Sequence, residues 1–273
     1  MKNKLKVGIV GCGAIGSYLA KTLVDKFNRK AKLSAIFDIQ REKSKSLEDK
    51  LGKKNLCTLN LEDLILKSDL VIEATQAASS YAIAKSSLSL GRHIMVMSVG
   101  GILKNFFELE KLARDNKVKL IIPSGAICGI DGLKALVLSK IKKVLLSTYK
   151  PPLAFKDNPY LLRKNINLEK IKKETLIFKG DALKAIKFFP QNINICATLS
   201  IVLGNPKKVK VKIFTSPYID KNIHELEVES NAGRIFVRCE NLVCPENPKT
   251  SYLAVLSAVS CLKDFIQSFK IGT

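Results

Sequence analysis

Three glycines near the start of the chain have the spacing of a phosphate-binding turn. An apolar run precedes Gly11, and a helical pattern continues after Gly13 and Gly16. In such a turn the first glycine permits the tight bend, the second lets backbone approach a pyrophosphate, and the third lets the helix lie close to the strand. The N–H groups that open the helix, at Ala14 and Ile15, then face the phosphates. The spacing predicts a dinucleotide-binding site.

A carboxylate stands where such a site needs one. Asp38 ends the second apolar run, about 20 residues after Gly16, which is where an acidic residue binds the adenosine ribose and repels a 2′-phosphate. The alternative is that Asp38 caps a helix that begins near Gln40. Because Arg41 could accept a 2′-phosphate, we expect NAD or NADP as the cofactor.

Small polar turns follow the next apolar runs. Ala74 and Thr75 follow the third run, and Ser98 and Gly100 follow the fourth. In an open parallel sheet, ligands bind beyond the carboxyl ends of the strands. We therefore expect these four residues to contact the cofactor, although each turn alone could be an ordinary connection.

Two histidines occur in the chain, and they differ in setting. His93 begins an apolar run, which is typical of a packed structural residue. His224 lies at a predicted loop-to-strand junction, and imidazole is the side chain best suited to proton transfer near neutral pH. His224 is therefore either the catalytic residue or a surface histidine.

Further polar groups lie at two predicted helix starts. Asn192 and Asn194 could cap a helix, or bind a nicotinamide amide and a substrate carboxylate. Lys249, Thr250 and Ser251 combine a cation with two hydroxyls at the start of the last helix, which favours carboxylate binding, although capping also explains Thr250. No set of residues has metal-ligand spacing, so we expect no metal. Cys128 is the thiol nearest the predicted site, but no histidine is placed to activate it.

The order of predicted elements indicates an α/β protein of two domains. Apolar strands alternate with helices through the first 125 residues, which predicts a doubly wound parallel sheet of the Rossmann type. The pattern of residues 126–246 predicts an α+β substrate and oligomerisation domain with a mostly antiparallel sheet. Its lysine-rich part, 155–173, is predicted to be a surface excursion. The remaining residues, 247–273, contain a helix over 250–269 whose stripe of Leu253, Leu256, Val259 and Leu262 is expected to pack back on the first domain.

Composition limits the remaining possibilities. The 273 residues carry a net charge of +22, which is compatible with nucleic-acid binding. However, the lysines are spread along the chain without interleaved aromatics, so we expect no nucleic-acid partner. No stretch reaches the length of about 18 uncharged apolar residues that a membrane span needs. Seven scattered cysteines, an odd number, favour a reducing cytoplasmic setting.

Several segments taken together resemble the L-aspartate dehydrogenases of NAD biosynthesis. The glycine turn is shared with many dehydrogenases, whereas the later segments are more specific. In chain order the matching segments are VGCGAIG from Val10, VIEA from Val71, PSGAI from Pro123, FPQNIN from Phe189, NIHE from Asn222 and NPKTS from Asn247.

That resemblance implies a function and roles for three residues. The family oxidises L-aspartate to iminoaspartate with NAD or NADP, and its fold is similar to that of dihydrodipicolinate reductase. By residue match, Ala126 and Asn192 are expected to contact the cofactor and His224 to be catalytic. A homo-oligomer (dimer or tetramer) is implied, with quinolinate synthase as a possible acceptor of the imine. The alternatives are another amino- or imino-acid reductase and a non-catalytic NAD-sensing protein.

Overall fold

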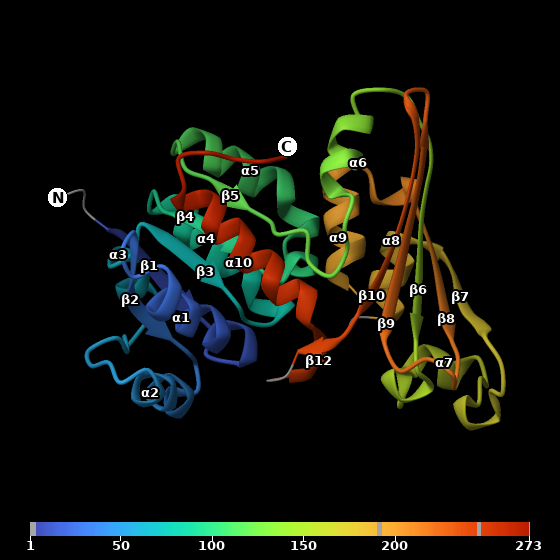
Figure 1. Ribbon diagram of the computed structural model, residues 1–273, viewed down its shortest axis with the longest axis horizontal. Coiled ribbons are helices and arrows are strands. Elements are labelled where there is room, and N and C mark those ends of the chain that lie inside the picture. The colour runs from blue at the N-terminus through green and yellow to red at the C-terminus, as the bar shows by residue number, and fades with distance from the viewer. Residues whose placement is uncertain (1–3, 190–192, 245–246, 273) are drawn as a thin grey trace. The chain divides into compact units, whose positions relative to one another are not determined.

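The chain forms two compact units. The computed structural model describes residues 4–189, 193–244 and 247–272. The first unit comprises Met1–Pro123 and Val255–Lys270, and the second comprises Ser124–Ala254 and Ile271–Thr273 (Figure 1). Each unit has its own sheet and its own apolar core.

The first unit is built on a five-stranded parallel sheet. The sheet order is β2-β1-β3-β4-β5, so the order reverses direction between β1 and β3, which is where ligands bind in such sheets. The predicted doubly wound parallel sheet is confirmed. Its strands are β1 (Leu5–Val10), β2 (Ala31–Phe37), β3 (Leu70–Glu73), β4 (His93–Val96) and β5 (Leu120–Ile121).

Helices pack on this sheet because their apolar side chains recur at helical spacing. Leu19 and Leu23 of the first helix, for example, are fully buried. The helices of this unit are α1 (Ala14–Lys26), α2 (Arg41–Lys50), α3 (Leu61–Leu66), α4 (Ala77–Ser89), η1 (Val99–Gly101), η2 (Leu103–Asn105), α5 (Phe106–Asp115) and most of α10 (Tyr252–Ile266).

The last helix differs from the prediction in length and phase. It ends at Ile266, and Phe269 beyond it is exposed. Its fully buried residues are Val255, Ala258 and Leu262, whereas Leu256 of the predicted stripe is 40% exposed. The first unit's core includes Ala258 and Leu262, and residues such as Phe265 pack against that core. The sequence of this helix is apolar at nearly every position, so it offers two neighbouring apolar stripes. Packing against the first unit decides which of the two is buried.

The second unit contains a mixed five-stranded sheet. Its order is β10-β9-β6-β8-β7; β6 and β8 are parallel, and every other pair is antiparallel. The turn Ser230–Gly233 joins β9 to β10. The strands are β6 (Ile141–Lys150), β7 (Thr175–Asp181), β8 (Val209–Thr215), β9 (Asn222–Ser230) and β10 (Gly233–Asn241), and a separate pair is β11 (Val243–Cys244) with β12 (Asn247–Ser251).

The two faces of this sheet differ in character. One face buries Leu146 and Leu226 against helices, and Leu199 of α9 belongs to the same core. The other face carries ion pairs across the strands, with the carboxylate of Glu227 2.9 Å from Lys143 and 2.7 Å from Arg234. The helices of the unit are α6 (Ile130–Leu136), η3 (Pro152–Phe155), α7 (Pro159–Arg163), η4 (Leu168–Lys170), α8 (Ala182–Phe188), α9 (Ile193–Val202) and η6 (Pro206–Lys208).

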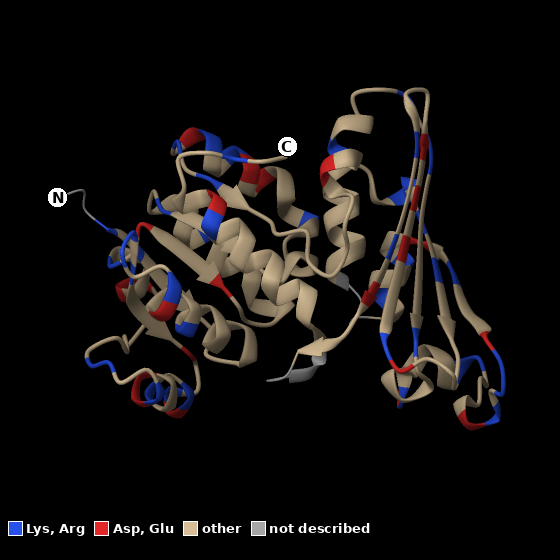
Figure 2. Ribbon diagram, in the orientation of Figure 1, with Lys and Arg blue, Asp and Glu red and all other residues tan. Residues whose placement is uncertain are grey.

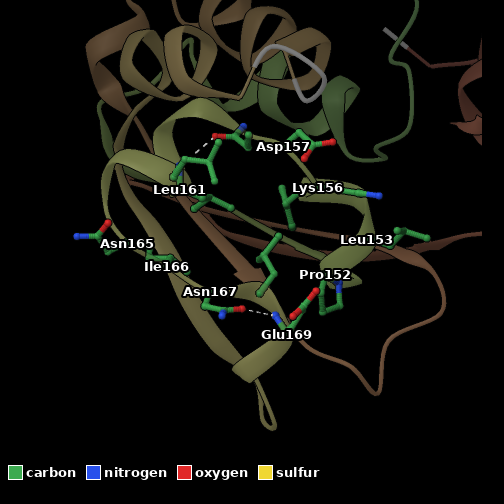
Figure 3. A pocket seen from close by; sticks show the side chains of 13 residues that line it. Pro152, Leu153, Lys156, Asp157, Leu161, Asn165, Ile166, Asn167 and Glu169 are labelled. Atoms are coloured by element: carbon green, nitrogen blue, oxygen red, sulfur yellow. Dashed lines mark hydrogen bonds between the residues drawn. The ribbon is translucent and has the colours of Figure 1, made fainter.

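The lysine-rich segment 155–173 is more ordered than predicted. Phe155 and Leu161 are buried in the core of the second unit, because the segment folds into η3, α7 and η4. It encloses a pocket of about 720 Å³ that Pro152, Leu153 and Ile166 help to line (Figure 3). Most of its other residues are exposed, so the segment is a surface excursion that two buried side chains anchor to the core.

Charge is distributed widely over both units. Lysine and arginine residues, blue in Figure 2, are spread over helices and strands of both units in the described part of the chain. Within the described part of the chain, no helix combines the length and hydropathy that crossing a membrane requires.

Candidate functional site

The glycine turn has the geometry its sequence predicts. Gly11 has a positive φ of 95°, and Gly13 is the N-cap residue of α1. A Cβ on Gly16 would lie 1.9 Å from the carbonyl oxygen of Gly11, so only glycine lets the helix start this close to the turn. A Cβ on Gly13 would meet nothing within 4 Å, so the space beside it is open. Gly13 directly precedes Ala14 and Ile15 in the first turn of α1, so the open space beside it is compatible with a pyrophosphate at the helix start.

Asp38 stands at the end of β2 and braces this turn. Its Oδ2 accepts a hydrogen bond from the N–H of Cys12 at 2.8 Å, and its Oδ1 accepts one from the N–H of Gln40 at 2.9 Å. The carboxylate is half-buried, so its remaining lone pairs are open to a ligand. The arrangement is compatible with ribose binding, and Asp38 also holds the turn in place.

Glu73 is a buried organiser that the sequence analysis did not single out. The side chain is fully buried at the end of β3. Its Oε1 accepts hydrogen bonds from the N–H (2.7 Å) and hydroxyl (2.6 Å) of Thr75, and its Oε2 accepts one from the N–H of Ser98 (2.9 Å). The Ser98 hydroxyl in turn donates to the Thr75 carbonyl at 2.7 Å. One carboxylate thus holds the two predicted cofactor turns together.

The other predicted residues of this unit lie in the same two turns. Ala74 follows β3 directly, and its carbonyl oxygen would be 2.5 Å from a Cβ on Gly11. Gly100 lies in the short helix η1 that follows β4. All the predicted cofactor residues of the first unit therefore lie beyond the carboxyl ends of parallel strands, as expected.

In the second unit, His224 lies inside a strand. It is the third residue of β9, which begins at Asn222, so the predicted loop-to-strand junction lies two positions before it. The side chain is only 4% exposed, so the surface alternative was wrong. Its register partner on β6 is Thr148, whose hydroxyl lies 3.0 Å from Nδ1 of the imidazole. Burial, and after it the ammonium of Lys150, lower the pKa of His224 to about 3. The imidazole is therefore neutral at physiological pH and able to accept a proton.

The loop that carries Ala126 is fixed to the neighbouring strand. Asn241 donates a hydrogen bond from Nδ2 to the carbonyl of Ala126 at 3.0 Å, and Cys128 donates its N–H to the sulfur of Cys239 at 3.3 Å. Because Cys239 is the register partner of His224 on β10, Ala126 and His224 belong to one region of the second unit. Burial and the Cys239 thiol raise the pKa of Cys128, which argues against an activated nucleophile.

One residue of the predicted substrate segment 249–251 contacts the strand that carries His224. Ser251 is buried, and its hydroxyl accepts a hydrogen bond at 3.5 Å from Nδ2 of Asn222, two positions before His224. Thr250 and Ser251 belong to β12, and α10 begins only at Tyr252, so the prediction that these residues open the helix was wrong. Lys249 belongs to β12 by its backbone.

Of the two predicted asparagines, Asn192 and Asn194, the structure describes Asn194. Asn194 is exposed in the first turn of α9. Asn192 lies outside the described residues.

Two other features carry no catalytic geometry. His93 accepts a hydrogen bond at Nδ1 from the N–H of Lys119 at 2.9 Å, and its ring meets Phe265 edge to face, as a structural residue does.

The pocket of segment 155–173 contains none of the predicted site residues, and its Asn158 and Asn167 oxygens accept hydrogen bonds from backbone N–H groups (Figure 3). Among the described residues, no three acidic, cysteine or histidine side chains gather as a metal site would require.

The chain is similar to known proteins over its whole length. Residues 11–123 match the family model "Homoserine dehydrogenase, NAD binding domain", and residues 131–265 match "Aspartate dehydrogenase, C-terminal". The chain is 42% identical over 274 residues to the L-aspartate dehydrogenase of Methanocaldococcus jannaschii and 40% identical over 271 residues to that of Methanosarcina barkeri. Each match covers 98% of this chain and 100% of the relative.

Solved structures have the same fold. The aspartate dehydrogenase of Thermotoga maritima matches with a TM-score of 0.74 at 23% identity, covering 99% of this chain and 100% of that one. A hyperthermophilic archaeal homoserine dehydrogenase, solved with NADPH, matches with a TM-score of 0.62 at 13% identity, covering 99% of this chain and 100% of that one. The two family models and the full-length identity agree with the sequence resemblance. This chain is a member of the L-aspartate dehydrogenase family.

Proposed function

We propose that this protein oxidises L-aspartate to iminoaspartate with NAD or NADP. The observation that carries the proposal is the neutral, buried imidazole of His224, held by Thr148 in a chain of this family. Such a group is suited to take the proton that an amine loses as its Cα gives up a hydride. When bound, the nicotinamide supplies the hydride acceptor.

In this proposal the first part of the chain binds the cofactor, and the second part supplies the reacting groups. Residues 1–125 bind the dinucleotide through the glycine turn, Asp38 and the turns that Glu73 joins, and the helix within 247–273 belongs with them. Residues 126–246 supply the reacting groups. In this domain Ala126 and Asn192 contact the nicotinamide end of the cofactor.

Substrate binding needs groups that match two carboxylates and an amine. Asn194, Lys249, Thr250 and Ser251 offer an amide, a cation and two hydroxyls, which are suitable donors to carboxylate oxygens. The hydrogen bond from Asn222 to Ser251 supports the assignment, because Asn222 stands two positions from His224 on the same strand.

A direct assay tests the activity. The purified protein is mixed with NAD or NADP and each member of a panel of amino acids, and formation of the reduced cofactor is followed by absorbance. Turnover with L-aspartate above the rest of the panel is expected. Turnover with another amino acid alone would favour the other reductase, and cofactor binding without any turnover would favour an NAD-sensing protein.

The catalytic assignment has its own test. We expect the variant His224→Ala to lose about two to four powers of ten in turnover, the usual range for a general acid–base group, with little change in NAD affinity. The matched control is His93→Gln, which removes the other histidine from a structural position. Equal losses in both variants, or unchanged turnover in His224→Ala, would contradict the role of His224.

Assembly and product transfer are part of the proposal. The sheet face that carries Glu227 and its ion pairs also exposes Phe236 (59% exposed), and we propose that it joins copies of the chain into a dimer or tetramer. A monomer in sedimentation analysis would contradict this. The imine passes to quinolinate synthase or hydrolyses to oxaloacetate and ammonia. The seven free thiols suit a cytoplasmic setting.

A further inference from the structure

A lysine stands beside His224 that the sequence analysis did not notice. Lys150 is the last residue of β6, two positions after Thr148. Because side chains alternate along a strand, Lys150 and Thr148 lie on the same face of the sheet, and Thr148 is the register partner of His224. The ammonium of Lys150 is close enough to lower the pKa of His224. Lys150 and His224 therefore belong to one site.

The backbone of Lys150 is held firmly at this position. Its register partner on β8 is Thr215, whose hydroxyl donates to the Lys150 carbonyl at 3.0 Å. Pro151 and Pro152 follow at once and end the strand. The side chain thus starts from a fixed point at the end of the sheet where Asn222 also stands, at the start of the antiparallel strand β9.

The charge of Lys150 lacks a counterion among the described residues. By contrast, the neighbouring lysine Lys143 on the same strand pairs with Glu227 at 2.9 Å. Lys150 has no ion pair in the described parts of the chain, and burial alone lowers its pKa to about 8. The nearest acidic residue along β9, Glu225, points to the opposite face, where it pairs with Arg238.

Lys150 is half-buried, and a cation withdrawn from water without a partner costs stability, so its retention calls for a ligand. By strand position, the residues nearest to it on the same face of the sheet are Thr148 on β6 and His224 and Asn222 on β9. An ammonium donates hydrogen bonds, so the ligand class that fits this charge is a small anion whose oxygens accept them.

We propose that the ammonium of Lys150 binds one carboxylate of the dicarboxylic substrate and so positions that substrate against His224. This inference rests on the proposed function and adds a specificity-determining residue to it. The bound carboxylate also neutralises the charge that faces the imidazole. Substrate binding therefore makes His224 more basic at the moment when a proton must be accepted.

Three variants test the role of Lys150. Lys150→Gln removes the charge, Lys150→Met removes it without leaving a polar group, and Lys150→Arg keeps it. The matched control is Lys142→Gln, which removes an exposed lysine at the other end of β6. The measurements are the KM for L-aspartate, kcat, the affinity for NAD, and calorimetric titration with succinate, a dicarboxylate without an amine.

We expect Lys150→Gln and Lys150→Met to raise the KM for L-aspartate and to weaken succinate binding by about 10- to 100-fold, the usual value of a charge-assisted hydrogen bond. Lys150→Arg retains part of the affinity, and NAD affinity stays unchanged in all variants. Thermal unfolding of the two neutral variants is unchanged or shifted upward, because a merely structural lysine would destabilise the fold when removed.

A second readout concerns the imidazole. The titratable groups that face His224 among the described residues are Lys150 on β6 and Cys239 on β10. Removing the Lys150 charge should shift the acidic limb of the kcat/KM profile to higher pH, whereas Lys142→Gln should leave it in place.

The outcomes separate this inference from the proposed function. Unchanged succinate affinity in folded Lys150→Gln or Lys150→Met, or no succinate binding by the parent protein, would overturn the role of Lys150. A parent protein that binds succinate through Lys150 but does not oxidise L-aspartate would contradict the proposed activity and leave the anion site intact.

Discussion

The hydroxyl of Thr148 lies 3.0 Å from Nδ1 of His224. The two residues are 76 positions apart in sequence and are joined only by the pairing of β6 with β9. The bond sets the plane of the imidazole. In the proposed mechanism Nδ1–H donates to the Thr148 hydroxyl, and Nε2 is then the nitrogen that accepts a substrate proton. Because the ring is buried, a different rotamer of His224 would find few other hydrogen-bond partners for its two nitrogens.

Removal of this hydroxyl should slow the reaction without disturbing the cofactor. For Thr148→Val, which keeps the shape of the side chain, we expect kcat to fall about tenfold, the value of one ordinary hydrogen bond. NAD affinity should not change. The control is Ser147→Ala, which removes a hydroxyl one position away on the opposite face of β6. Equal kinetics for Thr148→Val and the parent enzyme would mean that the bond does not orient the catalytic ring.

The glycine turn allows a test that separates folding from cofactor approach. A Cβ on Gly13 meets nothing within 4 Å, so Gly13→Ala should fold with unchanged thermal stability while NAD affinity falls at least about tenfold. A Cβ on Gly16 lies 1.9 Å from the Gly11 carbonyl, so Gly16→Ala should lose about 1–3 kcal/mol of stability. Thermal unfolding and NAD titration measure both. Full NAD affinity in Gly13→Ala would place the pyrophosphate elsewhere.

The choice between NAD and NADP should depend on the charge of Asp38. In Asp38→Asn one side-chain oxygen remains to accept the bond from Cys12, but the charge that repels a 2′-phosphate is gone. We expect the ratio of kcat/KM for NAD over NADP to fall about tenfold or more. The control is Asp25→Asn, an exposed residue of α1. An unchanged ratio would assign the selectivity to another residue, such as Arg41.

The buried histidine should make the fold sensitive to acid. The unfolded chain protonates His224 near pH 6.5, whereas burial keeps the folded imidazole neutral down to about pH 3. Between these values the unfolded state binds the extra proton, so the free energy of unfolding falls as the pH is lowered, by up to about 1.4 kcal/mol per pH unit. Chemical denaturation across this range measures the slope.

The variant His224→Gln isolates this contribution. Its slope between pH 6.5 and 3 should be smaller than that of the parent by the contribution of one proton. An identical slope would mean that the imidazole is protonated in the folded state, and with it the neutral proton acceptor of the proposed mechanism would be lost.

Local sequence was sufficient to predict the fold of the proposed cofactor site. A tight turn, a close helix and a carboxylate at the next strand end are properties of short segments, so Gly11, Gly16 and Asp38 could be placed from spacing alone. The buried bracing by Glu73 could not, because it depends on which strands become neighbours. Its signal, an acidic residue at the end of an apolar strand, was present but does not specify its donors.

Tertiary structure decided the chemistry of the other half. The sequence determined that His224 is a candidate and that the chain resembles a dehydrogenase family. It did not determine that the ring is buried, that Thr148 holds it, or that Lys150 shares its face, because strand register joins residues that no local pattern links. Packing against the first unit likewise decided which stripe of α10 is buried, because Leu256 was expected inside and Ala258 is buried instead. The glycine turn is thus read from sequence, whereas the electrostatics of His224 arise only when β6, β9 and β10 pair.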